Sequence, residues 1–428
     1  VQRYYREVHH SKVAYGSLAE EEVMAYLDFM KQNKQEADSL LDLRIKEHPH
    51  LSTRYVNYLR NYYTTNLGAY LMQTRFYAKD YKLPKDFMDF VTTECWARRS
   101  VPYTLYCDMN DFTNDYLDYI GEGLSGTDAI DLVLTHDQKG TITLSETERQ
   151  AFQNYKGEVE QLRKAVEGCT VEEKKVLVED FNNGELVTQV NKVFIRLQSE
   201  LREADLINRA QRVTETAKCD SVLRDFYTAH TLYDYIDDMR QPLAEMTIDW
   251  LNENIKLDFA RQQVLALNEK YEALSRKDFS NSTNLLSTDN LEGITEGEQI
   301  LRKIIEPWKG KIILIDVWGT WCGPCKEALK HSQELYERMK AYDMFFLYMA
   351  NNSNEISWKN VINEYNVTGE NVGHVNLPTD QQSAVEDFLK VNSYPSYFLI
   401  DREGHLLEVN ADPRNLDQFE ELVKRVGK

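Results

Sequence analysis

The chain has 428 residues, of which 42% are hydrophobic and 28% are charged, and its formal net charge is −20. This length and composition predict a soluble protein of two or three globular domains. The negative charge argues against nucleic acid and anionic membranes as partners. No apolar stretch is long enough to span a bilayer, and the chain begins at Val1. We therefore expect a processed protein, for which membrane anchoring through a removed N-terminal segment stays open.

Residues 1–285 predict a large, mainly α-helical domain. Capping boxes, in which a Ser or Thr precedes a Glu by three residues, mark helix starts at Ser17, Ser145 and Thr170. Only Thr141–Leu144 shows the alternation that is typical of a strand. The role of this domain is not indicated by any motif, and a partner-binding module stays open as its interpretation.

A polar, turn-rich stretch at residues 278–284 predicts a domain boundary. The sequence after it alternates between strand and helix patterns, which predicts a second domain over residues 286–428 with an α/β fold closed by a hairpin. Strands are expected near residues 311–317, 344–350, 374–377, 396–401 and 405–409. Helices are expected near residues 323–340, 355–365, 381–391 and 415–427.

The six cysteines are too few for a disulfide-rich scaffold in a chain of this length. Four are scattered and are most simply buried small residues: Cys95, Cys107, Cys169 and Cys219. A Cys95–Cys107 or a Cys169–Cys219 bridge stays open. Cys322 and Cys325 have the C-x-x-C spacing, but a zinc site needs two further ligands, which the sequence does not offer at close spacing. We therefore expect no metal, and no cofactor other than a redox-active Cys322–Cys325 disulfide.

Cys322 lies between a predicted buried strand and a predicted helix. Unpaired N–H groups and the helix dipole favour an anion there, and the thiolate is the nucleophilic form of cysteine. Cys322 is therefore the candidate attacking thiol, and Cys325, one helical turn further, is the candidate resolving thiol. Asp316 lies among apolar residues of the strand. Burial would raise its pKa toward neutrality, which suits a base for Cys325.

The segment Ile315–Lys326 resembles the active site of thioredoxins, and Val391–Asp401 resembles the segment that carries the cis-proline of that family. The longer spacing between them, with a predicted helix at Trp358–Tyr365, is similar to the TlpA/ResA-like thiol-disulfide oxidoreductases of bacteria. The resemblance covers residues 286–428 and implies a thioredoxin fold. It also implies a reductase of protein disulfides or mixed disulfides, recharged by an upstream thiol electron donor in the periplasm or otherwise outside the cytoplasm.

The resemblance also assigns further site residues. It implies a cis Tyr394–Pro395 bond beside the cysteines, which would leave the backbone of Tyr394 free to pair with an extended substrate. Trp321 is expected to shield the disulfide. Gly323 and Pro324 are expected to fix the loop that orients the thiols toward the substrate, and this Gly-Pro pair resembles the reducing members of the family.

The sequence departs from the family pattern at two positions. Lys330 stands where a kinking proline is usual, so we expect a straighter helix. Tyr394 replaces the small or β-branched residue that usually precedes the cis-proline. Two alternatives stay open: a disulfide oxidase or isomerase, and a helical partner-binding scaffold whose redox domain serves one partner.

Overall fold

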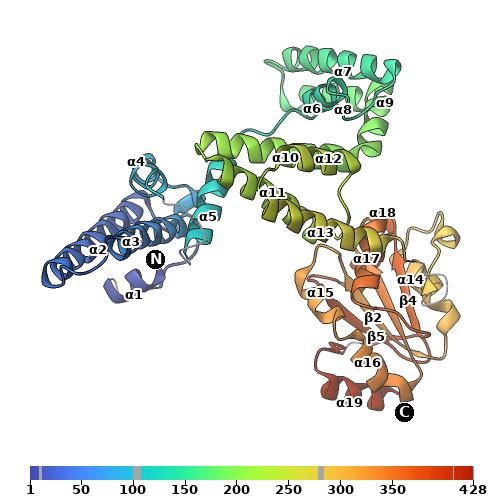
Figure 1. Cartoon of the computed structure of the whole chain (residues 1–428). Helices are drawn as coiled ribbons and strands as arrows, with labels where there is room; N and C mark the ends of the chain where they lie inside the picture. The colour runs from blue at the N-terminus through green and yellow to red at the C-terminus, as the bar shows by residue number, and fades with distance from the viewer. Residues whose placement is uncertain (9–11, 100–107, 278–283, 408, 428) are drawn as a thin grey trace. The chain divides into compact units, whose positions relative to one another are not determined.

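The computed structural model describes residues 1–8, 12–99, 108–277, 284–407 and 409–427. Its contacts divide the chain into two compact units, residues 1–126 with 209–220, and residues 127–208 with 221–428. Helices dominate the chain up to residue 275, as the sequence predicts (Figure 1). The second unit joins some of these helices to the predicted α/β domain. The predicted boundary stretch lies outside the described residues, except for Asn284.

The first unit is an assembly of helices. They are α1 (Gln2–Val8), α2 (Glu20–Glu47), α3 (Thr53–Met72), α4 (Lys85–Phe90), which continues as a π-helical turn at Val91–Trp96, and α5 (Met109–Glu122). Helices α3 and α5 pack closely at Gly68, where an added Cβ would come within 2.5 Å of the Phe112 ring. Glycine at this position therefore permits the approach of the two helices.

The second unit begins with a further series of helices. They are α6 (Ala129–Gln138), α7 (Glu146–Ala165), α8 (Val171–Asn182), α9 (Glu185–Arg196), α10 (Gln198–Thr216, which crosses into the first unit), α11 (Ser221–Met239), α12 (Glu245–Asn254) and α13 (Asp258–Ser275). The predicted capping boxes at Ser145 and Thr170 are confirmed, because each side chain accepts a bond from the N–H of the Glu three residues later. These caps start α7 and α8.

Two predictions for the helical region are wrong. Ser17 does not cap α2, because its Oγ donates to Ala14 O, and the capping bond is made by Glu22, whose Oε2 accepts from the N–H of Ala19. Thr141–Leu144 forms no strand but joins α6 to α7. Its alternation arises because Ile142 and Leu144 are buried in the core between the helices.

A six-stranded sheet forms the centre of the C-terminal part. Its strands are β1 (Asn284–Leu285), β2 (Ile312–Trp318), β3 (Met344–Ala350), β4 (Val372–Asn376), β5 (Ser396–Ile400) and β6 (Leu406–Leu407). The order is β1-β4-β3-β2-β5-β6, in which β1 to β4 are parallel and β5 and β6 are antiparallel to their neighbours. The five predicted strands are confirmed, and β1 was not predicted.

Helices cover both faces of this sheet. They are α14 (Gly297–Ile305), α15 (Gly323–Leu329), α16 (Ser332–Met339), α17 (Glu355–Glu364), α18 (Thr379–Leu389) and α19 (Leu416–Val426). Successive residues of a strand point to opposite faces. Ile312, Leu314 and Trp318 therefore pack with α15, α16, α17 and α19, whereas Ile313 and Ile315 pack with α14 and α18. The predicted thioredoxin fold is confirmed.

The expected straight helix over residues 323–340 is wrong, because the structure breaks it into α15 and α16. Lys330 and His331 form a tight turn in which the N–H of His331 bonds to Ala328 O, one residue short of the α-helical partner. This turn needs no proline. Leu329 before the turn and Ser332 after it are both buried, so α15 and α16 both stay packed on the sheet.

Helix α17, which contains the predicted insertion, binds the sheet with one face and the helices α11 and α13 with another. Trp358, Val361 and Ile362 belong to the core on the sheet. The outward face is polar, and its side chains make these bonds: Asn354 Nδ2 to Gln241 Oε1 (2.8 Å), Asn360 Nδ2 to Arg240 O (2.8 Å), Asn363 Nδ2 to Leu274 O (3.2 Å), and Glu364 from Lys270 and Tyr271 (2.5 and 3.1 Å). The insertion thus joins the C-terminal α/β domain to the helical region of its own unit.

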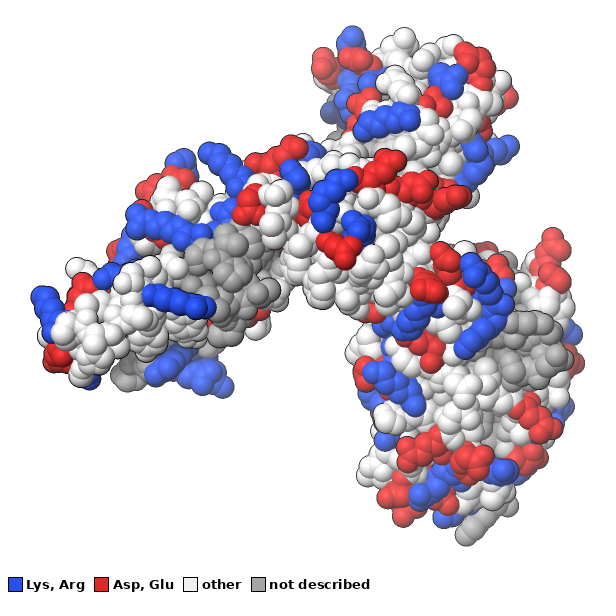
Figure 2. All heavy atoms as spheres, viewed as in Figure 1, with Lys and Arg blue, Asp and Glu red and all other residues white. Residues whose placement is uncertain are grey.

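Basic and acidic side chains alternate over the surface. On the face that Figure 2 shows, Lys and Arg lie interspersed with Asp and Glu. Many of them form ion pairs one helical turn apart, such as Arg302 with Glu298 and Lys359 with Glu355. Exposed pairs of this kind contribute little to stability. We therefore expect the buried amide contacts of α17, rather than its exposed ion pairs, to stabilise its packing on α11 and α13.

Replacing Asn360 by Ala tests this junction. Asn360 is fully buried, and its loss leaves Arg240 O without its partner. We expect the free energy of unfolding to fall by about 2 kcal/mol, measured by urea denaturation of the full chain. Lys359→Ala, on the same helix but in an exposed ion pair, is the matched control and should change stability by less than about 0.5 kcal/mol. Equal effects of the two variants would contradict the assignment.

Candidate functional site

A disulfide joins Cys322 and Cys325, the predicted attacking and resolving cysteines, at the start of α15. Cys322 is the N-cap of this helix, and its Sγ accepts a hydrogen bond of 3.1 Å from the N–H of Cys325. Free N–H groups at a helix start stabilise negative charge, so the position favours a thiolate at Cys322. Cys325 is the more buried of the two, with 1% of its surface exposed against 4% for Cys322.

The loop between β2 and α15 is held by hydrogen bonds at each residue. The N–H of Cys322 bonds to Gly319 O, and the N–H of Thr320 bonds to Ser353 Oγ, both at 3.0 Å. Trp321 lies over Gly319, where an added Cβ would come within 2.6 Å of the indole Nε1. Half of the Trp321 surface is exposed. The predicted shielding residue therefore lies at the rim beside the disulfide.

The Tyr394–Pro395 peptide bond is cis, as expected from the resemblance. It immediately precedes β5, whose first residue, Ser396, pairs with Val317 near the end of β2. The antiparallel pairing thus places Pro395 beside the C-terminal end of β2, where the cysteine loop starts. The ring of Tyr394 packs edge-on against Trp321, with 5.0 Å between ring centroids. Gly323 and Pro324 are exposed on the other side of Cys322.

Asp316 lies in the centre of the sheet, aligned with Tyr348 in β3 and Tyr397 in β5. It is buried, and its Oδ1 has no hydrogen-bond partner in the described part of the chain. The pKa of Asp316 is raised to about 8, chiefly by burial and also by the nearby Asp412, while Arg414 acts in the opposite direction. The predicted burial and raised pKa are both present, which leaves a carboxyl group that can exchange protons near neutral pH.

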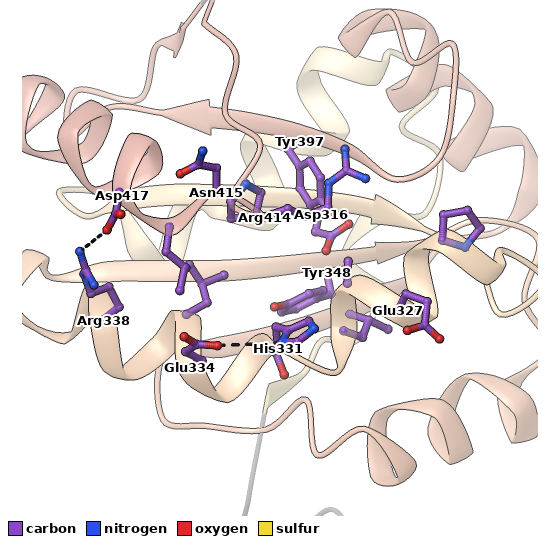
Figure 3. A pocket seen from close by; sticks show the side chains of 17 residues that line it. Asp316, Glu327, His331, Glu334, Arg338, Tyr348, Tyr397, Arg414, Asn415 and Asp417 are labelled. Atoms are coloured by element: carbon purple, nitrogen blue, oxygen red, sulfur yellow. Dashed lines mark hydrogen bonds and ion pairs between the residues drawn. The ribbon is translucent and has the colours of Figure 1, made fainter.

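A cavity of about 1040 Å³ lies next to Asp316 (Figure 3). Asp316, Tyr348 and Tyr397 line its sheet side, and helices α15 and α16 with the segment before α19 line the remainder. Pro324, which lies between the two cysteines, is also part of its wall. The cavity has room for water next to an unpaired carboxyl oxygen, so Asp316 has a route for protons despite its burial.

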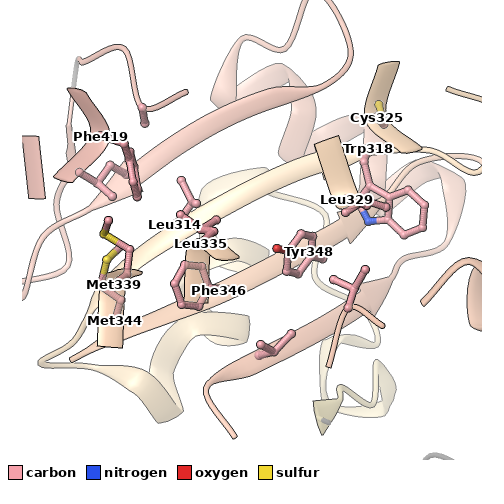
Figure 4. Packing of buried hydrophobic residues seen from close by; sticks show 14 of the residues in the cluster. Leu314, Trp318, Cys325, Leu329, Leu335, Met339, Met344, Phe346, Tyr348 and Phe419 are labelled. Carbon is pink, nitrogen blue, oxygen red and sulfur yellow. The ribbon is translucent and has the colours of Figure 1, made fainter. Parts of the chain in front are cut away.

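The buried cysteine is anchored on the core of the sheet. Cys325 packs in one cluster with Trp318, Leu329 and Tyr348 (Figure 4). Asp316 occupies the strand position between Leu314 and Trp318, which face the same cluster. Because alternate strand residues share a face, Asp316 points to the side of the sheet that α15 covers, the side on which Cys325 lies.

Some residues of the site carried no signal in the sequence. Glu386 of α18 accepts hydrogen bonds from Tyr394 and Asn351, and Arg414 and Asp412 lie in a loop and influence Asp316. Lys326 directly follows Cys325, and burial, followed by the charge of Arg240, lowers its pKa. Except for the bond between Tyr394 and Glu386, which are eight positions apart, these interactions join distant parts of the chain.

The other described cysteines are not paired. Cys95, Cys169 and Cys219 are free thiols, so a Cys169–Cys219 bridge is not formed, and Cys107 lies outside the described residues. Burial raises the pKa of Cys95 to about 12 and that of Cys219 to about 11, which makes both poor nucleophiles. In the described part of the chain, His, Cys, Asp and Glu side chains form no group of three that could hold a metal ion.

Comparisons with known proteins find thioredoxin-like relatives for part of this chain. Residues 310–406 match the family model of thioredoxin-like proteins. The thiol-disulfide oxidoreductase ResA of Bacillus thuringiensis (strain Al Hakam) is 27% identical over 131 residues, 31% of this chain and 70% of that protein. ResA of Bacillus subtilis (strain 168) is 32% identical over 101 residues, 24% of this chain and 53% of that protein.

Two solved structures with a similar fold each cover less than a third of this chain. The thioredoxin domain of a thiol-disulfide oxidoreductase from Bacteroides vulgatus is 22% identical, with a TM-score of 0.25, over 28% of this chain and 84% of that one. A thiol:disulfide interchange protein of the thioredoxin family from Chlorobium tepidum is 20% identical, with a TM-score of 0.26, over 29% of this chain and 85% of that one. The predicted resemblance of the C-terminal third to the TlpA/ResA-like group is confirmed by the sequence relatives.

Replacing Asp316 by Asn removes the buried acid. Its pKa of about 8 in the folded chain lies above the value of about 3.9 in an unfolded chain. The folded state therefore holds the proton more tightly, and the parent loses stability as pH rises from about 4 to about 8. We expect the variant to match the parent near pH 4 and to exceed its free energy of unfolding by a few kcal/mol at pH 9, measured by denaturant titration.

Asp387→Asn, at an exposed position of α18, is the control for this experiment. It should change stability little at either pH. A difference between Asp316→Asn and the parent that does not grow between pH 4 and pH 8 would show that the acid is not buried in its neutral form.

Proposed function

We propose that this chain is a thiol-disulfide oxidoreductase that reduces protein disulfides or mixed disulfides through Cys322 and Cys325. The observation that carries the proposal is the disulfide at the start of α15, directly after the central strand β2. One of its cysteines is placed where a thiolate is stabilised. The other lies one helical turn away, close enough to resolve an intermediate on the first.

The first step of the proposed reaction is an attack by the reduced enzyme. The Cys322 thiolate attacks one sulfur of the substrate disulfide, and a bond forms between that sulfur and Cys322 Sγ. The substrate S–S bond breaks, and its other sulfur leaves as a thiolate that takes up a proton. The N–H of Cys325, which donates to Cys322 Sγ, stabilises the charge of the attacking thiolate.

The second step returns the enzyme to the form that the structure holds. Cys325 transfers its proton to the ionised carboxylate of Asp316 and attacks Cys322 Sγ, so that the mixed disulfide breaks and the Cys322–Cys325 disulfide forms. The second substrate sulfur leaves as a thiolate that takes up a proton from water, and Asp316 releases the proton of Cys325 to water in the cavity, so it is ionised again. Two electrons and two protons have then passed to the substrate, and an upstream dithiol donor must supply them again.

Substrate binding is proposed to use the rim around Cys322. Strand pairing of β5 begins at Ser396, opposite Val317 near the end of β2, so the backbone of Tyr394 precedes the paired strand. An extended substrate segment that pairs with this backbone would bring its sulfur to Cys322. Trp321, which directly precedes Cys322 and is half exposed, and the exposed Gly323 and Pro324, which follow Cys322, are proposed to form the surface that an approaching substrate meets.

The partners and the location follow the relatives. We infer an extracytoplasmic protein that receives electrons from an upstream thiol donor and acts on proteins rather than on nucleic acid. None of the described helices is long and apolar enough to cross a membrane. The Gly-Pro pair between the cysteines favours the reducing direction over the oxidase or isomerase alternative.

Trapping of the mixed disulfide tests the function. In Cys325→Ala the attacking thiol remains and the resolving thiol is lost, so we expect protein substrates to accumulate as dithiothreitol-sensitive adducts on Cys322. Cys322→Ala should trap none. Cys169→Ala, which removes a free thiol outside the site, should behave as the parent. Adducts are detected by non-reducing electrophoresis and mass spectrometry.

Two outcomes would contradict the proposal. One is adduct formation that persists in Cys322→Ala, and the other is a parent chain that reduces no protein disulfide. The direction is decided by equilibration of the parent with thiol buffers. We expect a potential nearer to the roughly −270 mV of thioredoxin than to the roughly −120 mV of a strong oxidant.

A further inference from the structure

One carboxylate near the disulfide has no part in the mechanism described above. Glu386 of α18 is half-buried and accepts hydrogen bonds from three side chains. Tyr394 OH donates to Oε2 at 2.9 Å, Asn351 Nδ2 lies 2.9 and 3.0 Å from the two oxygens, and Gln382 Nε2 donates to Oε1 at 2.8 Å. All three partners are donors, which suits an ionised carboxylate because it only accepts.

This network reaches both aromatic rings beside the cysteines. Asn351 follows β3, and its backbone O accepts a hydrogen bond of 3.2 Å from the indole Nε1 of Trp321. The N–H of Asn351 donates to Trp318 O at 2.7 Å, which fixes its backbone on the end of β2. Tyr394 packs edge-on against Trp321. Glu386 therefore holds one ring directly and the other through Asn351.

The same contacts fix the orientation of the rings. Tyr394 has one hydroxyl partner, Glu386, and its ring is only partly buried, so the hydrogen bond is the contact that restrains the hydroxyl end. Bonds to an ionised acceptor are stronger than bonds between neutral groups. Two restrained aromatic rings lose little conformational entropy when a further apolar group packs on them.

Provided that the proposed function holds, we propose that Glu386 is a positioning residue that holds Tyr394 and Trp321 as a preformed aromatic rim. The rim selects polypeptide disulfides in which an aromatic or large apolar side chain flanks the reacting cysteine. A small disulfide, or a peptide with a small residue at that position, reaches Cys322 without using the rim. Glu386 acts through Tyr394 and Asn351 and makes no contact with the reacting sulfurs.

Single-turnover reduction by the full chain tests this inference. The chain is reduced, freed of reductant and mixed with one of two peptide disulfides that differ only in Phe or Ala next to the cysteine. The parent should saturate at a lower concentration of the Phe peptide. Glu386→Gln and Tyr394→Phe should each raise that concentration roughly fivefold, as expected for one lost hydrogen bond. For Glu386→Gln, reduction of the Ala peptide and the reduction potential should stay as in the parent.

Control variants separate this role from a general loss of structure. Asp387, the acidic residue next to Glu386 in the sequence, is exposed. Asp387→Asn should therefore behave as the parent with both peptides. The double variant of Glu386→Gln and Tyr394→Phe should be no worse than Glu386→Gln alone, because Tyr394→Phe removes only a contact that Glu386→Gln already weakens. Tyr394→Phe keeps the ring, so it tests the hydrogen bond even if Glu386→Gln fails to fold.

The outcomes distinguish this inference from the function on which it rests. If the parent reduces neither peptide, the proposed function fails and the inference falls with it. If the parent reduces both peptides but shows no preference for Phe, or if the variants slow both peptides equally, the inference alone is overturned. The inference would also be overturned if Glu386→Gln changed the reduction potential but not the preference for Phe. That result would mean that Glu386 acts on the redox chemistry itself.

Discussion

The position of β2 between parallel β3 and antiparallel β5 is the constraint on which the site depends. Parallel pairing with β3 buries β2 on both faces, so its end delivers the cysteine loop to the edge of a rigid sheet. Antiparallel pairing with β5 sets Val317 opposite Ser396 and thereby places Pro395 beside the same loop. The alternation of strand side chains then turns Asp316 to the face that α15 and the cavity occupy. One strand thus positions the thiols, the acid and the substrate-binding edge.

The insertion helix α17 connects this sheet to the helices α11 and α13. Its apolar face belongs to the core of the redox domain, and its polar face binds backbone and side chains of the helical region. These contacts lie near Lys326, the residue after Cys325. Lys326 is buried, which lowers its pKa, and the charge of Arg240 lowers that pKa further. Part of the large helical region therefore belongs to the same compact unit as the disulfide, and its charges act on the helix that carries the cysteines.

Local patterns predicted the parts of this structure that depend on neighbours in the sequence. Apolar runs located β2 and β3, and the apolar neighbours of Asp316 predicted its burial. The tight turn at Lys330 and His331 was missed because it follows from packing on the sheet and needs no proline. Strand β1 is two residues long and gives no periodic signal. Glu386 was missed because its partner Asn351 is 35 positions away, and only the fold brings them together.

The central claim is that Cys322 is the attacking thiol, activated by its place at the start of α15. The most direct measurement is the pH dependence of alkylation of the reduced chain by iodoacetamide, with each modified cysteine identified by mass spectrometry. The account predicts that Cys322 reacts first and titrates below the roughly 8.5 of an ordinary cysteine, while Cys325 and the buried Cys95 react slowly. A Cys322 that titrates at or above 8.5, or that reacts no faster than Cys169, would contradict it.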